Sequence, residues 1–372
     1  MQIFIDIGHP AHVHYFKNFI KLMRKKNHNF FVTSRKKEVA HDLLDYYGID
    51  YYSRGSGGDN ALTKFIYMFK ADKLLYQLAK KFNPDIFLSF GSSYAAHVSK
   101  LLGRPHITFD DTEHARLGHM TYIPFTDVIL TPSSFLKDFG KKHVRFDGCM
   151  ELSSLHPSYF KPDESILKIL GVQRDELYVI MRFVAWRASH DFSCQGLSLD
   201  TKLKLCHELS KYAKIFISSE SGLPGSLEKF QIKIPPAKLH DALAFSALCI
   251  GEGSTTANES AVLGIPNILV NSILIPKTTP GVHFELQRLG LQFLFCSEKG
   301  ILEKAIEILR DPNSKKAFYQ RKQKMLSDKI DVIAFMVWFV ENYPASFQTM
   351  KQNPDYQDNF RSKVNFPPFF GQ

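Results

Sequence analysis

Long hydrophobic runs are missing from this sequence of 372 residues. The longest predominantly apolar stretches, Ala242–Ile250 and Val332–Val340, have 9 residues each, whereas a membrane-spanning helix needs roughly 18. The first apolar run meets Asp6 after five residues, and no basic segment of the kind found in a secretory signal precedes it. These absences predict a cytoplasmic protein rather than one that spans a membrane or is secreted.

Cysteine is also scarce, and no two cysteines stand at the C-x-x-C spacing of a zinc site. An odd number of isolated cysteines favours reduced thiols over disulfides. The spacing therefore gives no sign of a zinc site. We also expect no metal ion or organic cofactor besides the substrate. The five cysteines are Cys149, Cys194, Cys206, Cys249 and Cys296.

Acidic residues are outnumbered, with 37 Asp+Glu against 47 Lys+Arg and a formal net charge of +10. Residues 1–150 hold 21 basic and 14 acidic residues, a net of +7, together with 10 of the 15 histidines. A hydrophobic content of 44% with 23% charged residues excludes a disordered or fibrous chain. No RNA-binding or helix-turn-helix signature accompanies the basic charge, so we do not expect nucleic acid as a partner.

Short β-branched or aromatic runs alternate with helical patterns, which is typical of βαβ units and parallel sheets. The alternation stops near Phe146 and restarts after a segment that contains Gly148, Pro157 and Pro162. We therefore predict an α/β protein with two doubly wound, Rossmann-like domains whose ligands bind beyond the carboxyl ends of the strands, in a central cleft. The predicted divisions are a first domain at 1–147, a connector at 148–165, a second domain at 166–329, and a C-terminal helix and tail at 330–372 that packs back on the first domain.

Individual strands and helices follow from the same patterns. The predicted strands are Gln2–Ile7, Phe30–Ser34, Asp85–Phe90, His106–Phe109 and Asp127–Thr131, then Tyr178–Phe183, Lys214–Ser218, Leu248–Gly251 and Pro266–Val270. The predicted later helices are Asp200–Tyr212, Leu239–Ser246, Thr256–Leu263, Gly300–Arg310 and Ile330–Asn342.

A turn of small residues, Gly251–Ser254, follows a strand in the second domain and leads into a helix that begins at about Thr255. Backbone N–H groups and the hydroxyls of Ser254, Thr255 and Thr256 at such a helix start favour an anion. Glu259 lies four residues into the helix, within reach of a ribose diol. The alternative is structural, with Ser254 as an N-cap and Glu259 as a first-turn partner of the helix dipole.

Histidines follow the first strand in the segment Ile7–His14. Pro10 suits the first position of a helix, which places His9 and His12 at the edge where ligands bind. Imidazole titrates near neutral pH and can deprotonate a hydroxyl as a general base. Capping or packing histidines, and a metal site, are the alternatives; the three histidines of the segment do not share one helix face.

An acidic turn, Asp110-Asp111-Thr112-Glu113-His114, follows another strand of the first domain. Crowded carboxylates raise the pKa of one of them, which suits acid–base chemistry. A solvated turn without a chemical role is the alternative.

Two arginines, Arg182 and Arg187, end and follow the first strand of the second domain. Forked hydrogen bonds from one of them would neutralise a diphosphate. The alternative is a pair of surface arginines stacked on Trp186.

A lysine-rich stretch, Lys64–Lys81, also carries Phe65, Ile66 and Phe69. This composition fits a helix on a membrane surface, and it also fits a helix that packs its apolar face on the sheet and solvates its lysines.

Taken together, these segments resemble the two-domain GT-B fold of nucleotide-sugar enzymes. Residues Gly251–Val270 resemble the donor-site signature of that superfamily, in which a small-residue turn is followed by Thr/Ser, then Glu, then Gly-x-Pro (Gly264-Ile265-Pro266). His12-Val13 resembles part of the Gly-His-Val of the bacterial transferase that adds N-acetylglucosamine to lipid-linked muramyl peptide. Residues 1–345 look most like an uncharacterised family related to that transferase and to UDP-N-acetylglucosamine 2-epimerase.

The resemblance implies roles for the residues already named. Ser254, Thr255 and Thr256 would meet the diphosphate, Glu259 the ribose, and the loop Ile234–Lys238 would border the base. His12, with His9 beside it, would lie near the acceptor. Glu113, in the context Glu113, Leu117, Gly118, would match a carboxylate that the epimerases use, with Asp111 in the same turn.

Two departures from the relatives concern the donor site. Both relatives carry Gly-Asn-Pro at the domain connector, whereas this chain reads Asp147-Gly148-Cys149-Met150-Glu151. The transferase's glycine-rich turn after the first strand of its second domain is replaced by the stretch with Arg182 and Arg187. Side-chain charge would therefore have to compensate for a backbone that approaches the phosphates less closely.

The leading hypothesis is a metal-independent glycosyltransferase of cell-surface polysaccharide synthesis that uses a UDP-sugar, with a histidine as base on the acceptor hydroxyl. The alternatives are an epimerase or UDP-sugar hydrolase that relies on the acidic turn, and a nucleotide-sugar binding protein without turnover. The expected partners are a nucleotide sugar, a sugar or lipid-linked acceptor and, because the first half is basic, an anionic membrane face contacted peripherally.

Overall fold

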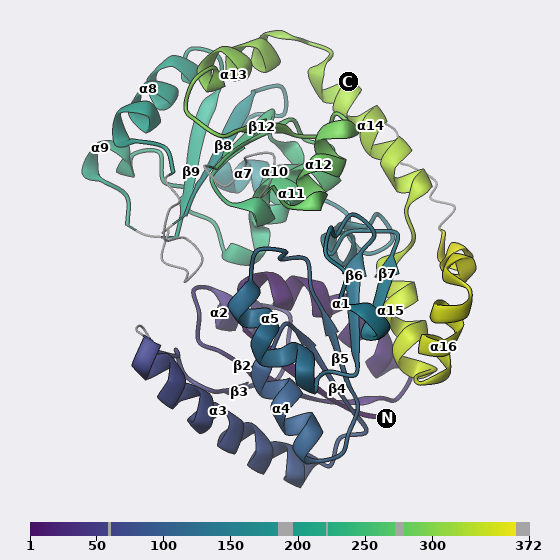
Figure 1. Cartoon of the computed structure of the whole chain (residues 1–372). Helices are drawn as coiled ribbons and strands as arrows, with labels where there is room; N and C mark the ends of the chain where they lie inside the picture. Colours follow the sequence, from purple (N-terminus) through teal and green to yellow (C-terminus); the bar gives the residue numbers. More distant parts are fainter. Residues whose placement is uncertain (59–60, 185–195, 221, 272–278, 362–372) are drawn as a thin grey trace. The chain divides into compact units, whose positions relative to one another are not determined.

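A computed structural model describes the chain except for residues 59–60, 185–195, 221, 272–278 and 362–372. The chain forms two compact units (Figure 1). Unit 1 comprises Met1–Ser154 together with Ile330–Ser362, and unit 2 comprises Leu155–Lys329. The first boundary falls inside the segment 148–165 that the sequence marks as a connector.

Unit 1 is built on a sheet of seven parallel strands in the order β3-β2-β1-β4-β5-β6-β7. Its central strands are continuous apolar runs because helices cover both faces of the sheet, as is usual for parallel sheets. The strands are β1 (Gln2–Ile7), β2 (Asn29–Ser34), β3 (Tyr52–Ser53), β4 (Ile86–Phe90), β5 (His106–Phe109), β6 (Val128–Pro132) and β7 (His143–Phe146).

The helices of unit 1 connect these strands. Helices α3, α4 and α5 form one layer, in which α4 contacts both of the others and the strands β4 and β5 (Figure 1). The helical elements are α1 (Pro10–Lys25), α2 (Ala40–Tyr46), α3 (Ala61–Phe82), α4 (Ser93–Leu101), α5 (Arg116–Tyr122), η1 (Ile123–Phe125), η2 (Gly140–Lys142) and α6 (Leu152–Leu155), whose last residue lies beyond the unit boundary.

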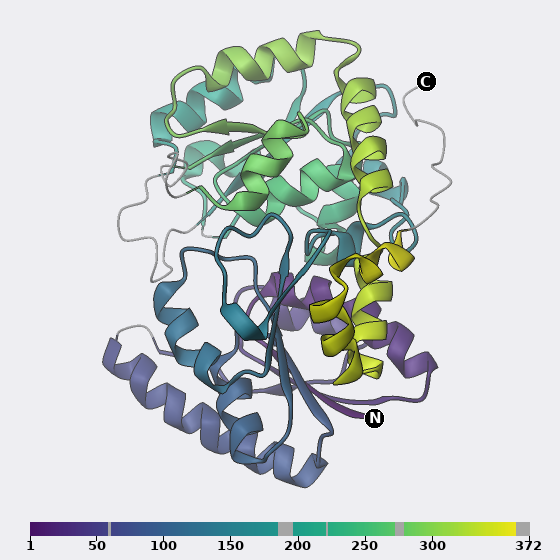
Figure 2. The same cartoon turned by 45° about the vertical axis from the view of Figure 1, so that its right-hand side comes forward.

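The C-terminal part of the chain completes unit 1. Helix α15 (Val332–Glu341) packs on α1, and α16 (Ala345–Gln352) contacts β7 (Figure 2). Phe335 and Phe339 of α15 are fully buried, and the Phe335 ring lies 6.0 Å from that of Phe146. The short helix η4 (Pro354–Phe360) closes this segment. The Pro- and Phe-rich tail lies outside the described residues.

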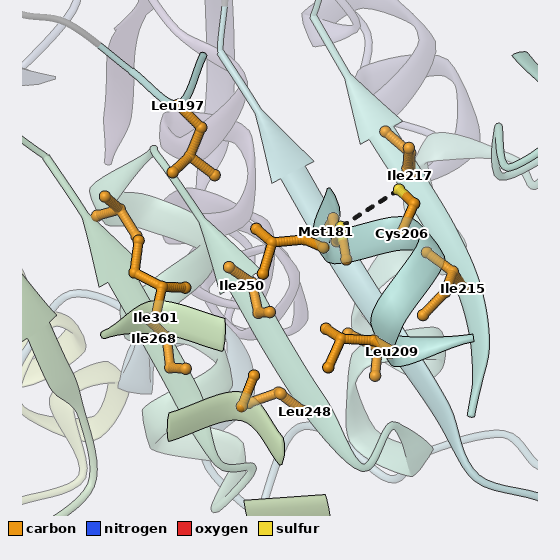
Figure 3. Close-up of a cluster of buried hydrophobic side chains, with 14 of the residues drawn as sticks. Met181, Leu197, Cys206, Leu209, Ile215, Ile217, Leu248, Ile250, Ile268 and Ile301 are labelled. Atoms are coloured by element: carbon orange, nitrogen blue, oxygen red, sulfur yellow. Dashed lines mark hydrogen bonds between the residues drawn. The ribbon is translucent and has the colours of Figure 1, made fainter. Parts of the chain in front are cut away.

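Unit 2 is built on a sheet of five parallel strands in the order β12-β11-β10-β8-β9. Its core is aliphatic and includes Met181, whose sulfur lies 3.9 Å from the Cys206 thiol (Figure 3). Burial raises the pKa of that thiol to about 11, so it is a packing group rather than a nucleophile. The strands are β8 (Tyr178–Phe183), β9 (Lys214–Ser219), β10 (Leu248–Gly251), β11 (Asn267–Val270) and β12 (Phe293–Phe295).

The helices of unit 2 alternate with these strands. A long amphipathic helix, α13, covers the core cluster with Ile301, Ala305 and Ile308. The helical elements are α7 (Ser165–Leu170), α8 (Leu199–Leu209), α9 (Gly225–Glu228), η3 (Pro236–Lys238), α10 (Leu239–Phe245), α11 (Ser254–Leu263), α12 (Gly281–Arg288), α13 (Ile301–Arg310) and α14 (Ser314–Asp328).

The α/β fold class predicted from the sequence is confirmed, with two parallel sheets in place. Strands β1, β5, β8 and β10 have the predicted bounds, and the other predicted strands differ by a residue at one or both ends. The prediction missed β3, β7 and β12, which have two to four residues each. Two or three residues are too few for a periodic signal, and the four residues of β7 include the polar Arg145 and His143.

Candidate functional site

The carboxyl ends of the unit 1 strands meet at one edge of the sheet, where ligands bind in folds of this kind. Strand β4 lies between β1 and β5, so the segment that follows β1 and the acidic turn that follows β5 share this edge. The His12 ring lies 4.8 Å from that of Phe90, the last residue of β4. The structure thus brings the predicted histidines and carboxylates to one edge of one sheet.

His9 and His12 both use ring nitrogen Nδ1 to accept a backbone hydrogen bond. His9 is the N-cap of α1 and accepts from the N–H of Ala11 at 3.2 Å. His12 accepts from the N–H of Gly8 at 3.3 Å. A neutral imidazole that accepts at Nδ1 carries its proton on Nε2. Both rings are therefore arranged to donate from Nε2.

The pKa of His12 falls to about 3 because burial disfavours the imidazolium and the nearby Lys37 and Arg54 charges repel it. At neutral pH the ring is uncharged, and a group with so low a pKa is a weak base. This geometry suits a hydrogen-bond donor to an oxygen of a bound molecule, a different role from the general base that the sequence suggests.

A buried ion pair that sequence reasoning did not find supports the same edge. Arg54 binds Asp6 through Nε at 2.9 Å and Nη2 at 3.2 Å, and both side chains are buried. Asp6 also accepts from Thr33 at 2.7 Å and Ser92 at 2.6 Å, while Arg54 Nη1 donates to Tyr67 at 2.8 Å. The sequence did contain a signal for this pair, the carboxylate of Asp6 within an otherwise apolar strand, because a buried charge needs a partner.

Asp110, the first residue of the acidic turn, is anchored within unit 1. Its carboxylate accepts from the Tyr122 hydroxyl and from the N–H of Thr112 at 2.8 Å, and it lies 2.9 Å from Nε2 of His119. Burial and the neighbouring Asp110 raise the pKa of Tyr122, so its hydroxyl keeps its proton. Asp110 therefore fixes the shape of the turn.

Asp111 has the most useful acid–base environment of the turn. Burial raises its pKa well above the usual range, and the nearby carboxylates of Glu151, Asp110 and Glu113 raise it further. One hydrogen bond opposes the shift, from the Thr112 hydroxyl to Asp111 Oδ1 at 3.0 Å. Asp111 thus tends to hold a proton when ordinary carboxyls have lost theirs.

Glu113 is buried in the same turn, and its Oε1 accepts from the N–H of Leu136 at 3.3 Å. Glu151, which the sequence analysis did not single out, is also buried and acts on the pKa of Asp111 from a position 40 residues along the chain. The turn and Glu151 form a carboxyl cluster that can both give and take protons. We call Asp110, Asp111, Glu113 and Glu151 the acidic cluster.

In unit 2, helix α11 begins directly after β10 at the carboxyl edge of the sheet. The N-cap is Gly253, in an extended conformation, and Ser254 is the first helical residue. Ser254 is therefore not the N-cap, so the structural alternative that gave it that role is wrong. The first N–H groups of a helix have no acceptor within the helix, and the exposed Ser254 and half-exposed Thr255 stand beside them, whereas Thr256 is buried.

Glycine is required at the turn before α11. A Cβ atom on Gly253 would lie 2.9 Å from Cγ1 of Val184 in the neighbouring strand connection. The close approach keeps the start of α11 against the end of β8 and leaves its N–H groups at the sheet edge, where an anion is favoured.

Two buried histidines hold polar residues of α11, and sequence reasoning missed both. His283 Nε2 lies 3.1 Å from the Ser254 hydroxyl, and its Nδ1 lies 2.8 Å from Gln292 Oε1. His240 Nε2 lies 2.9 Å from Oε1 of Glu259. Glu259 is buried and is the sixth residue of α11, beyond the first turn, so the alternative in which it is a first-turn partner of the helix dipole is wrong.

Arg182 lies at the end of β8, but its charge is already compensated. Its Nη1 donates to Ser218 at 2.9 Å, and its Nη2 pairs with Glu220 at 3.0 Å. Arg187, the second predicted phosphate ligand, lies outside the described residues.

Glu252 is a further residue whose role the sequence did not reveal. Its fully buried carboxylate accepts from the N–H groups of Val184 at 3.0 Å and Leu197 at 2.7 Å and pairs with Lys202 at 2.9 Å. This carboxylate ties the turn after β10 to the segments that follow β8.

Among the described residues, no three His, Cys, Asp or Glu side chains gather closely enough to hold a metal ion. A search of the same residues finds no helix long and apolar enough to cross a bilayer.

The two parallel sheets with their covering helices place the chain in the GT-B class of two-domain α/β folds. The chain belongs to the family described as "Protein of unknown function (DUF354)", whose model matches residues 1–339. An uncharacterized protein of Methanocaldococcus jannaschii is 27% identical over 281 residues, which are 72% of this chain and 81% of that protein.

Solved structures of two kinds share the fold. The UDP-GlcNAc 2-epimerase of Neisseria meningitidis, bound to UDP-GlcNAc, aligns with a TM-score of 0.62 and 12% identity over 86% of this chain and 94% of that one. The spinosyn rhamnosyltransferase SpnG, complexed with spinosyn aglycone, aligns with a TM-score of 0.58 and 14% identity over 92% of this chain and 100% of that one. At these identities the likeness shows the fold and leaves the reaction open.

Proposed function

We propose that this protein is an enzyme that cleaves the glycosyl–phosphate bond of a UDP-sugar and transfers the sugar to an acceptor hydroxyl. The observation that carries the proposal is the acidic cluster, in which Asp111 keeps its proton beside other carboxyl groups. Such a cluster offers an acid and a base at one sheet edge, which is what a reaction that moves a proton to or from a sugar hydroxyl needs.

Each unit has a separate role in this proposal. Unit 2 binds the nucleotide. The start of α11 and the Ser254 hydroxyl bind the diphosphate. Glu259, which His240 holds in place, binds the ribose. Arg182 gives less support than the sequence suggests, because Glu220 already pairs with it. The fold likeness to an epimerase bound to UDP-GlcNAc supports uracil as the base.

Unit 1 supplies the proton transfer. Glu113 takes the proton of the acceptor hydroxyl as its oxygen bonds to the anomeric carbon, and UDP leaves with the electron pair of the broken bond and with the proton that Asp111 holds. His9 and His12 donate hydrogen bonds from Nε2 and orient the sugar oxygens. The reaction needs no metal in this scheme, because the helix start and hydroxyl donors carry the phosphate charge.

A second candidate is a 2-epimerase or UDP-sugar hydrolase, which is favoured by the fold likeness to the UDP-GlcNAc 2-epimerase of Neisseria meningitidis and would use the same acidic cluster. Elimination of UDP followed by re-addition needs one group that gives up a proton and another that returns it, and a protonated carboxyl beside other carboxyls supplies both. Acceptor dependence separates the two candidates.

The test has a binding part and a turnover part. A thermal-shift screen of nucleotides should show stabilisation by UDP, about 2.7 kcal/mol at 100 times its dissociation constant. UDP release from UDP-N-acetylglucosamine should then require an acceptor from a panel of octyl glycosides and polyprenyl-diphosphate-linked monosaccharides, and should persist in chelator.

Three outcomes decide against the proposed transfer. UDP release without acceptor, with a 2-epimer detected by NMR, identifies the epimerase. UDP binding without turnover of any UDP-sugar in the presence of the acceptor panel indicates a binding protein. The absence of stabilisation by every uridine nucleotide rejects the nucleotide-sugar assignment itself.

A further inference from the structure

Helix α3 of unit 1 has a buried side and an exposed side, and apolar residues lie on both. Ala71, Leu75 and Ala79 are buried and recur every four residues, so they form the stripe that packs on the sheet. On the opposite side, Phe65 and Phe69 keep 56% and 57% of their surface exposed. One face of the helix therefore packs on the sheet, and another leaves aromatic side chains exposed.

The exposed phenylalanines belong to a basic surface. Three more exposed residues lie on the same side of the helix as the two phenylalanines: Ile66, Lys70 and Lys73. The spacings of three and four residues place all five together. The helix carries five lysines and a single acidic residue, Asp72, whose carboxylate is engaged by His97 at 2.9 Å. We call Phe65, Ile66, Phe69, Lys70 and Lys73 the α3 face.

A neighbouring helix of the same layer adds exposed apolar residues. Leu117 and Met120, in the first turns of α5, are 76% and 73% exposed. Helix α4 contacts both α3 and α5 (Figure 1). Helices that follow parallel strands begin at the carboxyl edge of the sheet, so the apolar starts of α3 and α5 lie toward the same edge as the acidic cluster.

We propose that the α3 face docks on the surface of an anionic lipid bilayer. Aromatic and aliphatic side chains enter the headgroup region while lysines beside them pair with lipid phosphates, the division of labour found in interfacial helices. A second copy of this chain is a poorer occupant, because it would bring the lysines of two α3 faces together. This inference does not depend on the reaction proposed above.

Flotation or sedimentation with unilamellar vesicles tests the proposal directly. The full chain should bind vesicles of 30% phosphatidylglycerol in phosphatidylcholine and bind pure phosphatidylcholine at least 10-fold more weakly. A lysine at an anionic surface strengthens binding by roughly fivefold, so the K70E/K73E variant should lose more than 20-fold. The F65S/F69S variant should lose at least 10-fold and leave the melting temperature unchanged, since both side chains are exposed.

Two matched variants control for charge and for exposed apolar surface. Lys21 and Lys25 are exposed on α1, whose Phe19 packs against Phe30, whereas Phe82 of α3 packs against the neighbouring Phe31. Successive strand residues point to opposite faces of a sheet, so K21E/K25E makes the same charge change on the side away from the α3 face. Leu101, 70% exposed at the end of α4, provides L101S. Both variants should retain binding within about threefold.

Equal binding to neutral and anionic vesicles, or equal losses in the α3-face and control variants, would overturn the proposal. A shift from dimer to monomer in F65S/F69S, measured by sedimentation equilibrium and without any vesicle binding by the wild type, would assign the face to a second copy instead.

Discussion

The carboxyl edges of the two sheets differ in how their polar side chains are used. At the unit 1 edge, Asp6 and Asp110 are paired with Arg54 and His119. Beside these pairs, the pKa of the Asp111 carboxyl is raised and the pKa of the His12 imidazole is lowered. At the unit 2 edge, the carboxylates of Glu252 and Glu259 are each held by a basic side chain. Both edges follow parallel strands, so the fold alone does not explain the contrast.

The contrast is the basis for the proposed division between chemistry in unit 1 and nucleotide binding in unit 2. Groups with shifted pKa values gather where protons are moved, whereas paired charges and a helix start keep a fixed arrangement of donors and acceptors. The variants below change one edge at a time and measure whether the other responds.

The largest effect is expected for Asp111→Asn. The amide keeps the shape and removes the transferable proton, so kcat for UDP release should fall by about 10²- to 10⁴-fold, while stabilisation by UDP stays as in the wild type. Asp175→Asn, at an exposed position of unit 2, is the matched control and should keep full activity. A fully active Asp111→Asn would remove the acidic cluster from the mechanism.

The same variant has a stability signature. Because the folded-state pKa of Asp111 lies above its unfolded value, the folded state holds the extra proton, and stability falls as the pH rises from the unfolded value through the folded one. Asp111→Asn should therefore be more stable than the wild type at pH 8 and closer to it at pH 4, as measured by urea unfolding.

Glu259→Gln should separate binding from chemistry at the other edge. Loss of a charged acceptor costs roughly 1.5–3 kcal/mol, so UDP affinity in calorimetry should fall by about 10- to 100-fold. The pH dependence of kcat at saturating UDP-sugar should not move, because the acidic cluster is untouched. A shifted pH profile would mean that Glu259 takes part in proton transfer.

His12→Gln tests the environment of the imidazole. Its folded-state pKa of about 3 lies below the usual 6.5, so its contribution to stability is present above pH 6.5 and is lost as the pH falls toward 3, by at most about 1.4 kcal/mol per pH unit. The variant should lose less stability than the wild type between pH 6.5 and 4.5. His207→Gln, whose side chain is 76% exposed, should show the wild-type slope.

The smallest effect is expected for Ser254→Ala, which removes one hydroxyl and leaves the backbone N–H groups of α11 in place. A neutral hydrogen bond contributes about 1 kcal/mol, so UDP affinity should fall about fivefold with kcat unchanged. A loss as large as that of Glu259→Gln would show that the hydroxyl held by His283, rather than the helix start, carries the phosphate.

Local patterns were sufficient to predict the parallel-sheet architecture. The buried runs of β8 and β10 gave the same bounds in sequence and structure because each is a short apolar segment between clear turn signals. Strand β3 could not be predicted, since Tyr52 and Ser53 are exposed and its existence depends on pairing with β2. The position of the acidic turn and of the first histidines followed from the strand ends alone.

The partners of the candidate residues could not be read from the sequence. His283 and Ser254 are 29 residues apart, and Arg54 and Asp6 are 48 residues apart. No local sequence pattern indicates that the two residues of either pair are in contact. The tautomer of His12 depends on the backbone N–H of Gly8, which only the turn geometry places within reach. The base role predicted for the histidines came from residue type, whereas the donor role follows from these contacts.

The return of α15 to unit 1 sets an order of events during translation. Unit 1 is opened by the first residues of the chain and completed by residues 330–362, whereas the described residues of unit 2 form one segment, Leu155–Lys329. At 5–20 residues per second, the ribosome needs roughly 10 to 40 s to pass from the end of the first segment to the end of α15. Throughout that interval the nascent polypeptide presents the apolar surface of α1 that α15 later covers.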